Sequence, residues 1–285
     1  MATTMFVART IEEMRSWRAA PEVAGANVAL VPTMGALHQG HMRLISDANR
    51  QAERVVVSIF VNPTQFGPSE DLDQYPRDFG NDEALCAGAG VDCIFYPTAE
   101  IMYPAGCRTI VEVEGISKTL EGQSRPNHFR GVTTVVLKLL NIVTPDVAVF
   151  GWKDAQQLII LRRMVADLDL PVQVVACETV REDDGLALSS RNTYLSAQQR
   201  REAPALYRAL QMGGQMVSAH NVLLADIVAN NVRDMVETES SGKVDYVAVT
   251  TIDTLAPLEL IAPGNTLISL AVYFGETRLI DNIRL

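Results

Sequence analysis

The sequence predicts a doubly wound α/β domain with a mainly parallel sheet, followed by a smaller α+β domain with an antiparallel sheet. In the first 180 residues, short continuous apolar runs alternate with helix-like segments, as in strands covered on both faces and joined by helices. Beyond residue 196, two helix-like segments follow each other directly, and strand-like runs end the chain. We therefore expect one domain over residues 1–180 and a second over residues 181–285.

The strands of the first domain are predicted from β-branched runs of five to nine residues. These runs cover residues 27–32, 54–61, 91–97, 146–150 and 172–180. Between the first two, Met42, Ile45 and Ala48 recur at helical spacing. Further helices are expected over 76–89, 131–143 and 154–168. This alternation implies right-handed crossovers between parallel strands.

The pattern changes at a polar loop over residues 181–196. Helices are expected over 197–219 and 222–238, and strands over 244–251, 265–274 and 277–285. Successive strands with short connections favour an antiparallel sheet. The sequence contains no internal repeat, no low-complexity tract and no long linker. The boundary between the two domains is therefore placed near residue 180 to within several residues.

Composition narrows the class of function. The chain has 285 residues and a formal net charge of -10, which argues against a nucleic-acid partner and favours a small-molecule substrate. Its apolar runs are shorter than the roughly 18 residues that a membrane span needs, so we expect no membrane partner. The four cysteines form no C-x-x-C pair and no secretory leader precedes them, so we expect buried free thiols in a cytoplasmic protein.

The stretch "PTMGALHQGHM", residues 32–42, joins the first predicted strand to its helix. It places Gly35 and Gly40 around His38 and His41. At the carboxyl edge of a parallel sheet, helix N-termini offer N–H groups to phosphates, and imidazoles can donate hydrogen bonds as negative charge builds. The turn therefore predicts a nucleotide phosphate site.

Two other interpretations of the histidines remain open. One histidine could cap the helix while the other faces water, which is the usual situation for a lone histidine. A zinc site is a further alternative, although no cysteine or acidic residue stands near the histidines at ligand spacing.

"MGALHQGH" resembles the H-x-G-H signature of the adenylate-forming and nucleotidyl-transferring Rossmann enzymes, which include class I aminoacyl-tRNA synthetases. Four further blocks resemble the pantoate–β-alanine ligases, or pantothenate synthetases, in order and spacing. They are "VSIFVNPTQF" (57–66), "EGQSRPNHFRGV" (121–132), "FGWKDAQQL" (150–158) and "DGLALSSRN" (184–192). The resemblance covers residues 28–195, with a weaker echo in "RLIDN" at 278–282. It implies a Rossmann-like first domain that binds nucleotide and pantoate, and a second domain that acts as a lid.

The resemblance also implies a two-step reaction. Pantoate carboxylate attacks the α-phosphate of ATP to give pantoyl adenylate and pyrophosphate, and β-alanine then displaces AMP to form pantothenate. Magnesium is expected with ATP; its protein ligands are unknown, with Asp78, Asp82 and Glu83 as possible ones whose alternative is a solvated helix face. The family further implies a homodimer.

The first step brings two anions together, so cations must offset their repulsion. His41 corresponds to the family's catalytic histidine, and His38, Lys153 and Arg191 are the other catalytic candidates. The block around Arg191 matches a mobile loop of related enzymes, so we expect it to close over ATP; helix capping by Ser189, Ser190 or Asn192 is the alternative. The resemblance assigns ATP binding to Met34, Gly35, Ala36, Leu37, His38, Gln39, Gly40, His41, Gly151, Trp152, Lys153, Asp154, Val180, Leu188, Ser189, Ser190 and Arg191.

Two glutamines are the candidates for pantoate. Neutral amides can orient a carboxylate and leave it nucleophilic, whereas an arginine clamp would partly neutralise its charge. The resemblance places Gln65 and Gln157 on pantoate, and Gln65 also near β-alanine. Met34, Phe60, Val136 and Leu139 are expected to form an apolar wall for its methyl groups, although an ordinary core role is equally open for the last three.

The departures from the family pattern are few. Trp152 stands where a polar residue is expected between Gly151 and Lys153, and Ala155 stands where an aromatic residue is common. The indole is expected to pack beside the nucleotide or to lie outside the site.

Two rival functions remain. A different adenylate-forming enzyme would share the H-x-G-H logic, although a tRNA synthetase would need a basic surface that this acidic chain lacks. A non-catalytic nucleotide-binding module would keep the fold without the chemistry. The joint presence of the two histidines, Lys153 and Arg191 argues against it.

Overall fold

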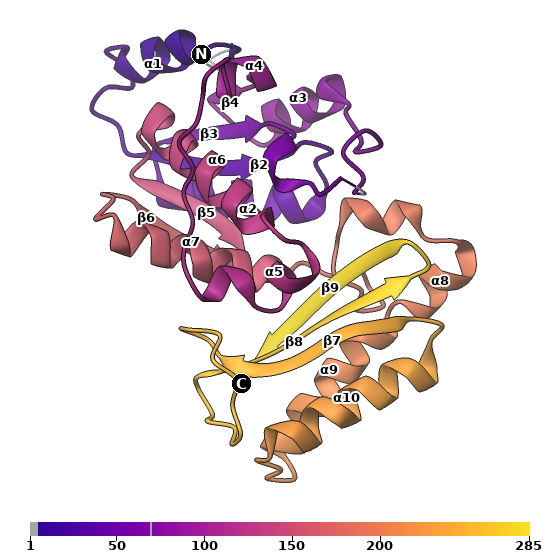
Figure 1. Cartoon of the computed structure of the whole chain (residues 1–285). Helices are drawn as coiled ribbons and strands as arrows, with labels where there is room; N and C mark the ends of the chain where they lie inside the picture. The colour runs from indigo at the N-terminus through magenta and orange to yellow at the C-terminus, as the bar shows by residue number, and fades with distance from the viewer. Residues whose placement is uncertain (1–4, 69) are drawn as a thin grey trace. The chain divides into compact units, whose positions relative to one another are not determined.

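The computed structural model describes residues 5–68 and 70–285. The chain divides into two compact units. Figure 1 colours the chain by residue number, from indigo at the N-terminus to yellow at the C-terminus. The first unit is Met1–Gly151 with Ile160–Cys177, and the second is Trp152–Ile159 with Glu178–Leu285. The expected domains, 1–180 and 181–285, stay a prediction.

The first unit is built on a parallel sheet. Six strands of the described residues form it, in the order β1-β4-β3-β2-β5-β6, and every recorded pairing is parallel. The strands are β1 (Phe6–Ala8), β2 (Val28–Thr33), β3 (Arg54–Ile59), β4 (Cys93–Phe95), β5 (Val147–Gly151) and β6 (Gln173–Cys177). The predicted doubly wound α/β fold is therefore confirmed.

Continuous apolar runs form the middle of this sheet because both of its faces are covered. Val28 to Val31 on β2 and Val55 to Val57 on β3 are at most 1% exposed. The helices of the unit are α1 (Ile11–Ala19), α2 (Gln39–Gln51), α3 (Phe79–Gly88), α4 (Ala99–Met102), α5 (Glu121–Ser124), α6 (His128–Val143) and α7 (Ala155–Asp167), the last of which crosses the division between the units.

The strand order fixes which helices share a face. From β2 the chain steps to β3 and β4 in one direction, then returns past them to β5 and β6. Right-handed crossovers place α2 and α3 on one face and α1 and α6 on the other, and α1 indeed packs on α6. Successive strands are added on one side of β2 and later on the side of β5, although all of them are parallel. The carboxyl ends of β2 and β5 therefore flank the topological switch point, where ligands bind in such sheets.

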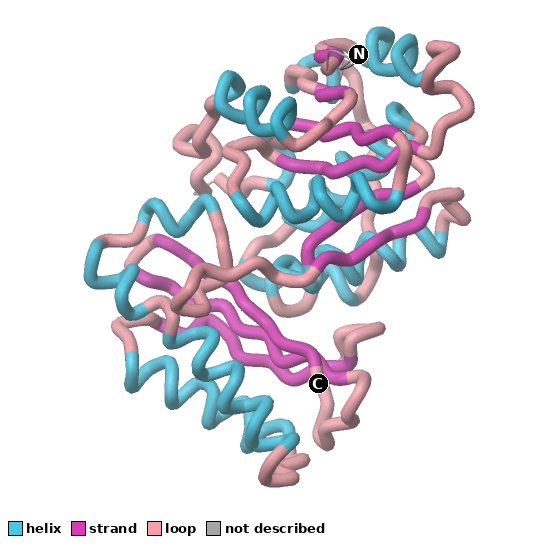
Figure 2. The backbone as a smooth tube through the Cα atoms, turned by 180° about the vertical axis from the view of Figure 1, so that it is seen from behind, coloured by secondary structure: helices cyan, strands magenta, loops and turns pink. Residues whose placement is uncertain are grey.

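The second unit contains an antiparallel sheet, as predicted. Among the described residues it has three strands, in the order β7-β8-β9. They are β7 (Lys243–Thr251), β8 (Thr266–Phe274) and β9 (Thr277–Arg284). Helices α9 (Ala205–Ser218) and α10 (Ala225–Glu239) pack together along one face of this sheet, as the tube in Figure 2 shows.

One helix expected over 197–219 is in fact two helices. The chain forms α8 (Ala197–Glu202) and then α9, which begins after Pro204. Proline lacks the N–H that a helix interior needs, so it interrupts the first helix and suits the start of the second.

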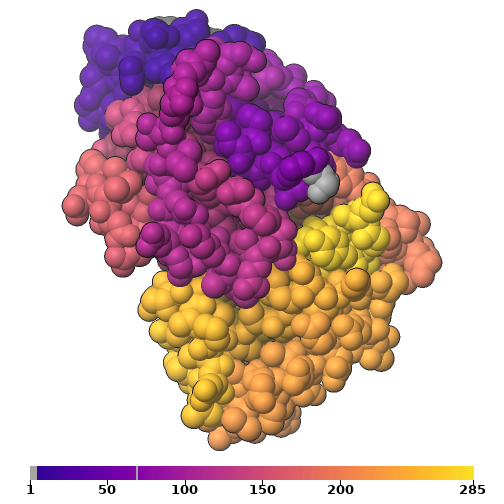
Figure 3. Space-filling model, in the orientation of Figure 1, coloured from indigo at the N-terminus to yellow at the C-terminus, as the bar shows by residue number. Residues whose placement is uncertain are grey.

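The expectation of four buried cysteines is wrong for one of them. Cys86, Cys93 and Cys177 are buried, but Cys107 is exposed. Its N–H donates to the Pro104 carbonyl at 3.0 Å, which closes a turn at the start of an irregular segment between α4 and α5 on the surface of the first unit (Figure 3). An irregular segment with few neighbours buries few side chains. In the described part of the chain, no helix is both long and apolar enough to span a membrane.

Candidate active site

The turn after β2 has a backbone conformation that few residues tolerate. Gly35 has φ +81° and Ala36 has φ +50°, both in the left-handed region. A Cβ atom on Gly35 would lie 2.9 Å from an Asp82 carboxylate oxygen and 3.0 Å from the Ile59 side chain. Glycine is therefore required at this position.

Asp82 on α3 holds this turn in place. Its two carboxylate oxygens accept the N–H groups of Ala36, at 3.0 Å, and Leu37, at 2.7 Å. The side chain is buried, and burial raises the pKa of Asp82 while the two N–H groups act to lower it. Asp82 thus connects α3 to the start of residues 34–41, which we call the histidine segment.

The two histidines begin α2. His38 is the N-cap residue, and its Nδ1 accepts the Gly40 N–H at 3.1 Å. His41 Nδ1 accepts the His38 N–H at 3.3 Å, which completes a reciprocal capping box. The ring centroids lie 4.1 Å apart. The capping alternative is correct for His38, but His41 also caps and both rings are half-buried.

This capping fixes the tautomer of both imidazoles. Since each Nδ1 accepts a hydrogen bond, the proton of each neutral ring resides on Nε2. No acidic residue occupies the first turn of α2, so the amide dipoles there favour an anion. The zinc alternative finds no support, because no group of three or more metal-ligating side chains occurs in the residues that the structure describes.

Gln65 contacts the histidine segment through Met34. Gln65 ends the short helix η1 (Pro63–Gln65), and its Nε2 lies 3.2 Å from the Met34 sulfur. The Asn62 side chain donates to Gln65 Oε1 at 3.0 Å. The structure therefore brings together two of the residues predicted to bind pantoate and holds the amide of one.

The block 121–132 supports the backbone of Gln65. His128 Nδ1 donates to the Gln65 carbonyl oxygen at 2.8 Å, and Arg125 lies 3.1 Å from His128 Nε2. Burial lowers the pKa of His128 to about 4, and the charge of Arg125 adds to this effect. His128 is therefore neutral at physiological pH. Arg125 in turn forms a two-contact ion pair with Glu70, with the shorter contact at 2.7 Å.

Gly131 allows α6 to approach η1. A Cβ atom there would lie 2.5 Å from the Thr64 carbonyl oxygen and 2.7 Å from Gln65 Cα. The Gly131 carbonyl accepts a hydrogen bond from the buried Asn62 side chain at 3.2 Å. Close backbone packing thus positions the glutamine turn from a second side.

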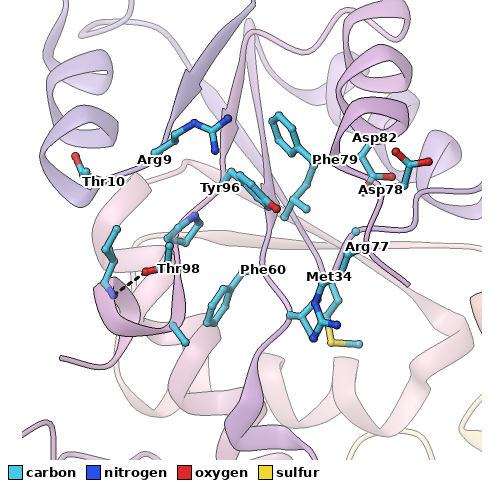
Figure 4. Close-up of a pocket in the computed structure, with 16 residues that line it drawn as sticks. Arg9, Thr10, Met34, Phe60, Arg77, Asp78, Phe79, Asp82, Tyr96 and Thr98 are labelled. Atoms are coloured by element: carbon cyan, nitrogen blue, oxygen red, sulfur yellow. Dashed lines mark hydrogen bonds between the residues drawn. The ribbon is translucent and has the colours of Figure 1, made fainter. Parts of the chain in front are cut away.

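A cavity of about 380 Å³ is lined by Met34 and Gly35 at the start of the histidine segment, but not by His38 or His41. Figure 4 shows Met34 and Phe60 among its lining side chains, with the Arg9 guanidinium beside the Phe79 and Tyr96 rings. Two residues of the predicted apolar wall thus face one cavity. The other two, Val136 and Leu139, are buried on α6, in agreement with the core role that was left open for them.

Two of the three possible metal ligands, Asp78 and Asp82, have other roles in the structure. Asp78 is the N-cap of α3 and accepts the Asn81 N–H at 3.1 Å. Asp82 is occupied by the turn after β2. Neither contact indicates a metal site.

In the second unit, Lys153 lies in a short helix, η3 (Trp152–Asp154), that directly follows β5 in the sequence. Its ammonium nitrogen is 3.6 Å from the Asp154 carboxylate. The Asn282 side chain donates to the carbonyls of Trp152, at 2.8 Å, and Lys153, at 3.1 Å. Trp152 is buried, and the Arg284 guanidinium lies 4.4 Å from its ring centroid. Packing of the indole beside the nucleotide stays a prediction.

The segment with the two serines is ordered by its own hydrogen bonds. Leu188 N–H donates to the Val180 carbonyl at 3.0 Å, which closes a hairpin. Ser189 caps η4 (Ser190–Tyr194) and accepts the Arg191 N–H at 3.3 Å. The capping alternative is thus correct for Ser189. Gln157 lies on the first turns of α7 and is half-buried.

The sequence did not identify the residues that hold these segments. They are Asn62, Asp82, Arg125, His128, Arg181, Asp281 and Asn282. A signal was present for five of them, because Asn62, Arg125 and His128 belong to blocks of the family resemblance and Asp281 and Asn282 belong to its weaker echo, "RLIDN". Asp82 and Arg181 lie outside those blocks.

Comparison with known proteins gives one consistent match. Residues 6–284 match the family model described as Pantoate-beta-alanine ligase. The chain is 52% identical over 279 residues to the pantothenate synthetase of Moorella thermoacetica, covering 98% of each chain.

Solved structures agree with this match. The pantothenate synthetase of Thermus thermophilus is similar, with a TM-score of 0.92, 46% identity, and coverage of 98% of this chain and 99% of that one. The pantoate-beta-alanine ligase of Francisella tularensis, complexed with beta-gamma ATP and beta-alanine, has a TM-score of 0.81 and 34% identity, with coverage of 99% and 98%.

Proposed function

We propose, from the premise that this chain belongs to the pantoate–β-alanine ligase family, that His38 and His41 stabilise the phosphates of ATP during adenylation of pantoate. The chain is an ATP-dependent ligase that condenses (R)-pantoate with β-alanine to pantothenate. The reaction passes through pantoyl adenylate and releases AMP and pyrophosphate.

The observation that carries the proposal is the pair of histidines at the start of α2. Both rings accept a backbone N–H at Nδ1, so in the neutral form both have an Nε2–H to donate. As pantoate oxygen attacks the α-phosphorus and the bond to pyrophosphate breaks, negative charge grows on the phosphate oxygens. Fixed N–H donors and the helix N-terminus stabilise that charge without reorganising. We assign His41 the main role and His38 the assisting one.

Gln65 and Gln157 orient pantoate in this proposal. An amide leaves the attacking carboxylate its full negative charge, which an arginine clamp would reduce. The contact of Gln65 with Met34 supports a role beside the histidine segment. We also place β-alanine near Gln65.

Lys153 and Arg191 offset the charge of ATP. Both belong to locally ordered segments, through Asp154 and through the Ser189 cap. We propose that residues 34–41, 151–154, 180 and 188–191 bind ATP, that the serine segment closes over it, and that the C-terminal domain acts as a lid.

In the second step the amine of β-alanine attacks the carbonyl carbon of the adenylate. The C–N bond forms, the bond to the AMP oxygen breaks, and the amine loses a proton. An acyl adenylate is already activated, so positioning suffices and no covalent enzyme intermediate is needed. In agreement, burial raises the pKa of Cys86 and Cys93 to about 12, so neither is a nucleophilic thiolate at neutral pH.

Three further properties belong to the proposal. Mg²⁺ accompanies ATP in this proposal, and no protein ligand is assigned to it. A cytoplasmic location suits the free cysteines. A homodimer follows from the family resemblance alone.

The test is exchange of labelled pyrophosphate into ATP with magnesium and without β-alanine. Exchange that depends on pantoate is expected, and adding β-alanine should release AMP and pantothenate. His41→Ala should lower turnover about a hundredfold or more and weaken ATP binding far less. His220→Ala, which changes an exposed histidine, is the matched control. Near-normal turnover of His41→Ala would contradict the role of that ring.

A further inference from the structure

The strand β9 carries a buried ion pair that lies outside the residues assigned to ATP. Asp281 is 3% exposed, and its two oxygens accept from the Arg181 guanidinium at 2.6 and 2.9 Å. The Arg181 guanidinium carbon lies 3.6 Å from the Tyr207 ring centroid. A buried pair of this kind contributes little net stability, because desolvation of both charges offsets their attraction. Net folding stability therefore does not explain why this ion pair is buried at this place in the second unit.

The next residue on β9 holds the Lys153 turn. Asn282 is buried and donates from one amide nitrogen to the carbonyls of Trp152 and Lys153. Its own N–H donates to Asp281 at 2.8 Å. Two residues later, Arg284 packs on the Trp152 ring. The turn is thus fixed by β9 at its backbone and at its indole.

The same arginine also holds the hairpin that leads into the serine segment. Arg181 donates to the Gly185 carbonyl at 3.1 Å and lies 3.4 Å from the Asn282 carbonyl. The hairpin is closed by Glu182 N–H to Leu186 and by Leu188 N–H to the Val180 carbonyl. Its last residue, Leu188, directly precedes Ser189, Ser190 and Arg191.

We propose that Arg181, Asp281 and Asn282 form one anchor that positions both ATP-binding segments of the second unit. These are positioning residues, since they act through the Lys153 turn and the Arg191 segment. The inference rests on the proposed assignment of those segments to ATP. It gives "RLIDN" a role, because that motif supplies the carboxylate and the amide of the anchor.

The same strand offers a matched control. Arg278 pairs with Asp245 at 2.6 Å and lies near the Tyr246 and Tyr273 rings. This pair matches the anchor in its shortest contact, but Asp245 is less buried than Asp281 and the two rings lie farther from the arginine, at 5.7 and 5.9 Å. Its recorded partners lie on β7 and β8. Asp245→Asn therefore perturbs an ion pair of the unit away from both segments.

The experiment compares Asn282→Ala, Arg181→Lys and Asp245→Asn with the wild-type protein. ATP affinity is measured by calorimetry, and the unfolding midpoint is recorded for each protein. Steady-state kinetics give KM for ATP and for β-alanine. Asn282→Ala and Arg181→Lys should weaken ATP binding about tenfold or more and leave KM for β-alanine within about twofold. Asp245→Asn should lower only the unfolding midpoint.

Equal ATP affinity in wild type and both anchor variants would overturn the inference, and so would equal weakening in Asp245→Asn. Arg181→Lys keeps the positive charge, so this variant tests the inference if Asn282→Ala does not fold. Because ATP affinity is measured without turnover, this result is separate from pantoate-dependent exchange in the wild-type protein, on which the proposed function depends.

Discussion

Acid should weaken the fold through His128, the buried histidine that supports the Gln65 turn. Its pKa falls from the ordinary 6.5 to about 4 in the folded protein, because burial and the neighbouring Arg125 disfavour the charged ring. Between these pH values the unfolded chain binds a proton that the folded chain does not. The stabilising contribution is therefore fully present above pH 6.5 and is lost as pH falls towards 4. That difference corresponds to about 3 kcal/mol of unfolding free energy.

The assay is urea unfolding of wild type and His128→Asn at several pH values across this window. Asn can still donate to the Gln65 carbonyl but cannot titrate, so the variant should lose less stability on acidification than the wild type does. His220→Asn is the control, because it makes the same substitution at an exposed histidine. Parallel loss of stability in wild type and His128→Asn would refute the reasoning.

Three other predictions follow from single contacts. Gly131→Ala should destabilise the protein by about 1–3 kcal/mol and raise KM for pantoate, whereas Gly88→Ala, where a Cβ meets nothing within 4 Å, should be neutral or stabilising in thermal unfolding. Asp82→Ala leaves two N–H groups without an acceptor, which should cost about 1–3 kcal/mol of unfolding free energy for each group. Asp82→Asn keeps one acceptor, so Asp82→Ala should lower kcat for adenylation more than Asp82→Asn does. Equal kcat in the two variants would contradict this prediction. A thiol reagent should modify Cys107 quickly in the native protein and the buried cysteines only after unfolding, as mass spectrometry would show.

The sequence predicted the sheet well where its strands are continuously apolar. The runs that became β2, β3 and β5 were recognised because a strand covered on both faces needs no polar residues. The edge strand β1 has three residues, too short for a periodic signal, and it was not predicted. Helix α1 was also missed, although Thr10 and Glu13 form a capping box at its start.

The sequence could point to a candidate site only where the candidate residues are contiguous, and their role in the chemistry stays a prediction. The turn from Met34 to His41 identified itself by its glycines and imidazoles. Asp82 and Asn282 could not be found in this way. Asp82 is 45 residues from its partner Leu37, and Asn282 is 130 residues from its partner Trp152. A local sequence pattern carries no information about hydrogen bonds between residues so far apart.

At the start of α2, the capping box creates a trade-off between folding stability and the proposed catalytic role of the histidines. Ser, Asp and Asn are preferred as N-cap residues, so a redesign guided by folding stability alone would replace His38, and would gain up to about 1 kcal/mol. The variant would have a more stable helix, but it would lose one of the two imidazoles that the proposed mechanism assigns to the phosphates. An engineer who seeks a heat-tolerant form of this ligase should therefore keep both histidines and look for stability elsewhere in the chain.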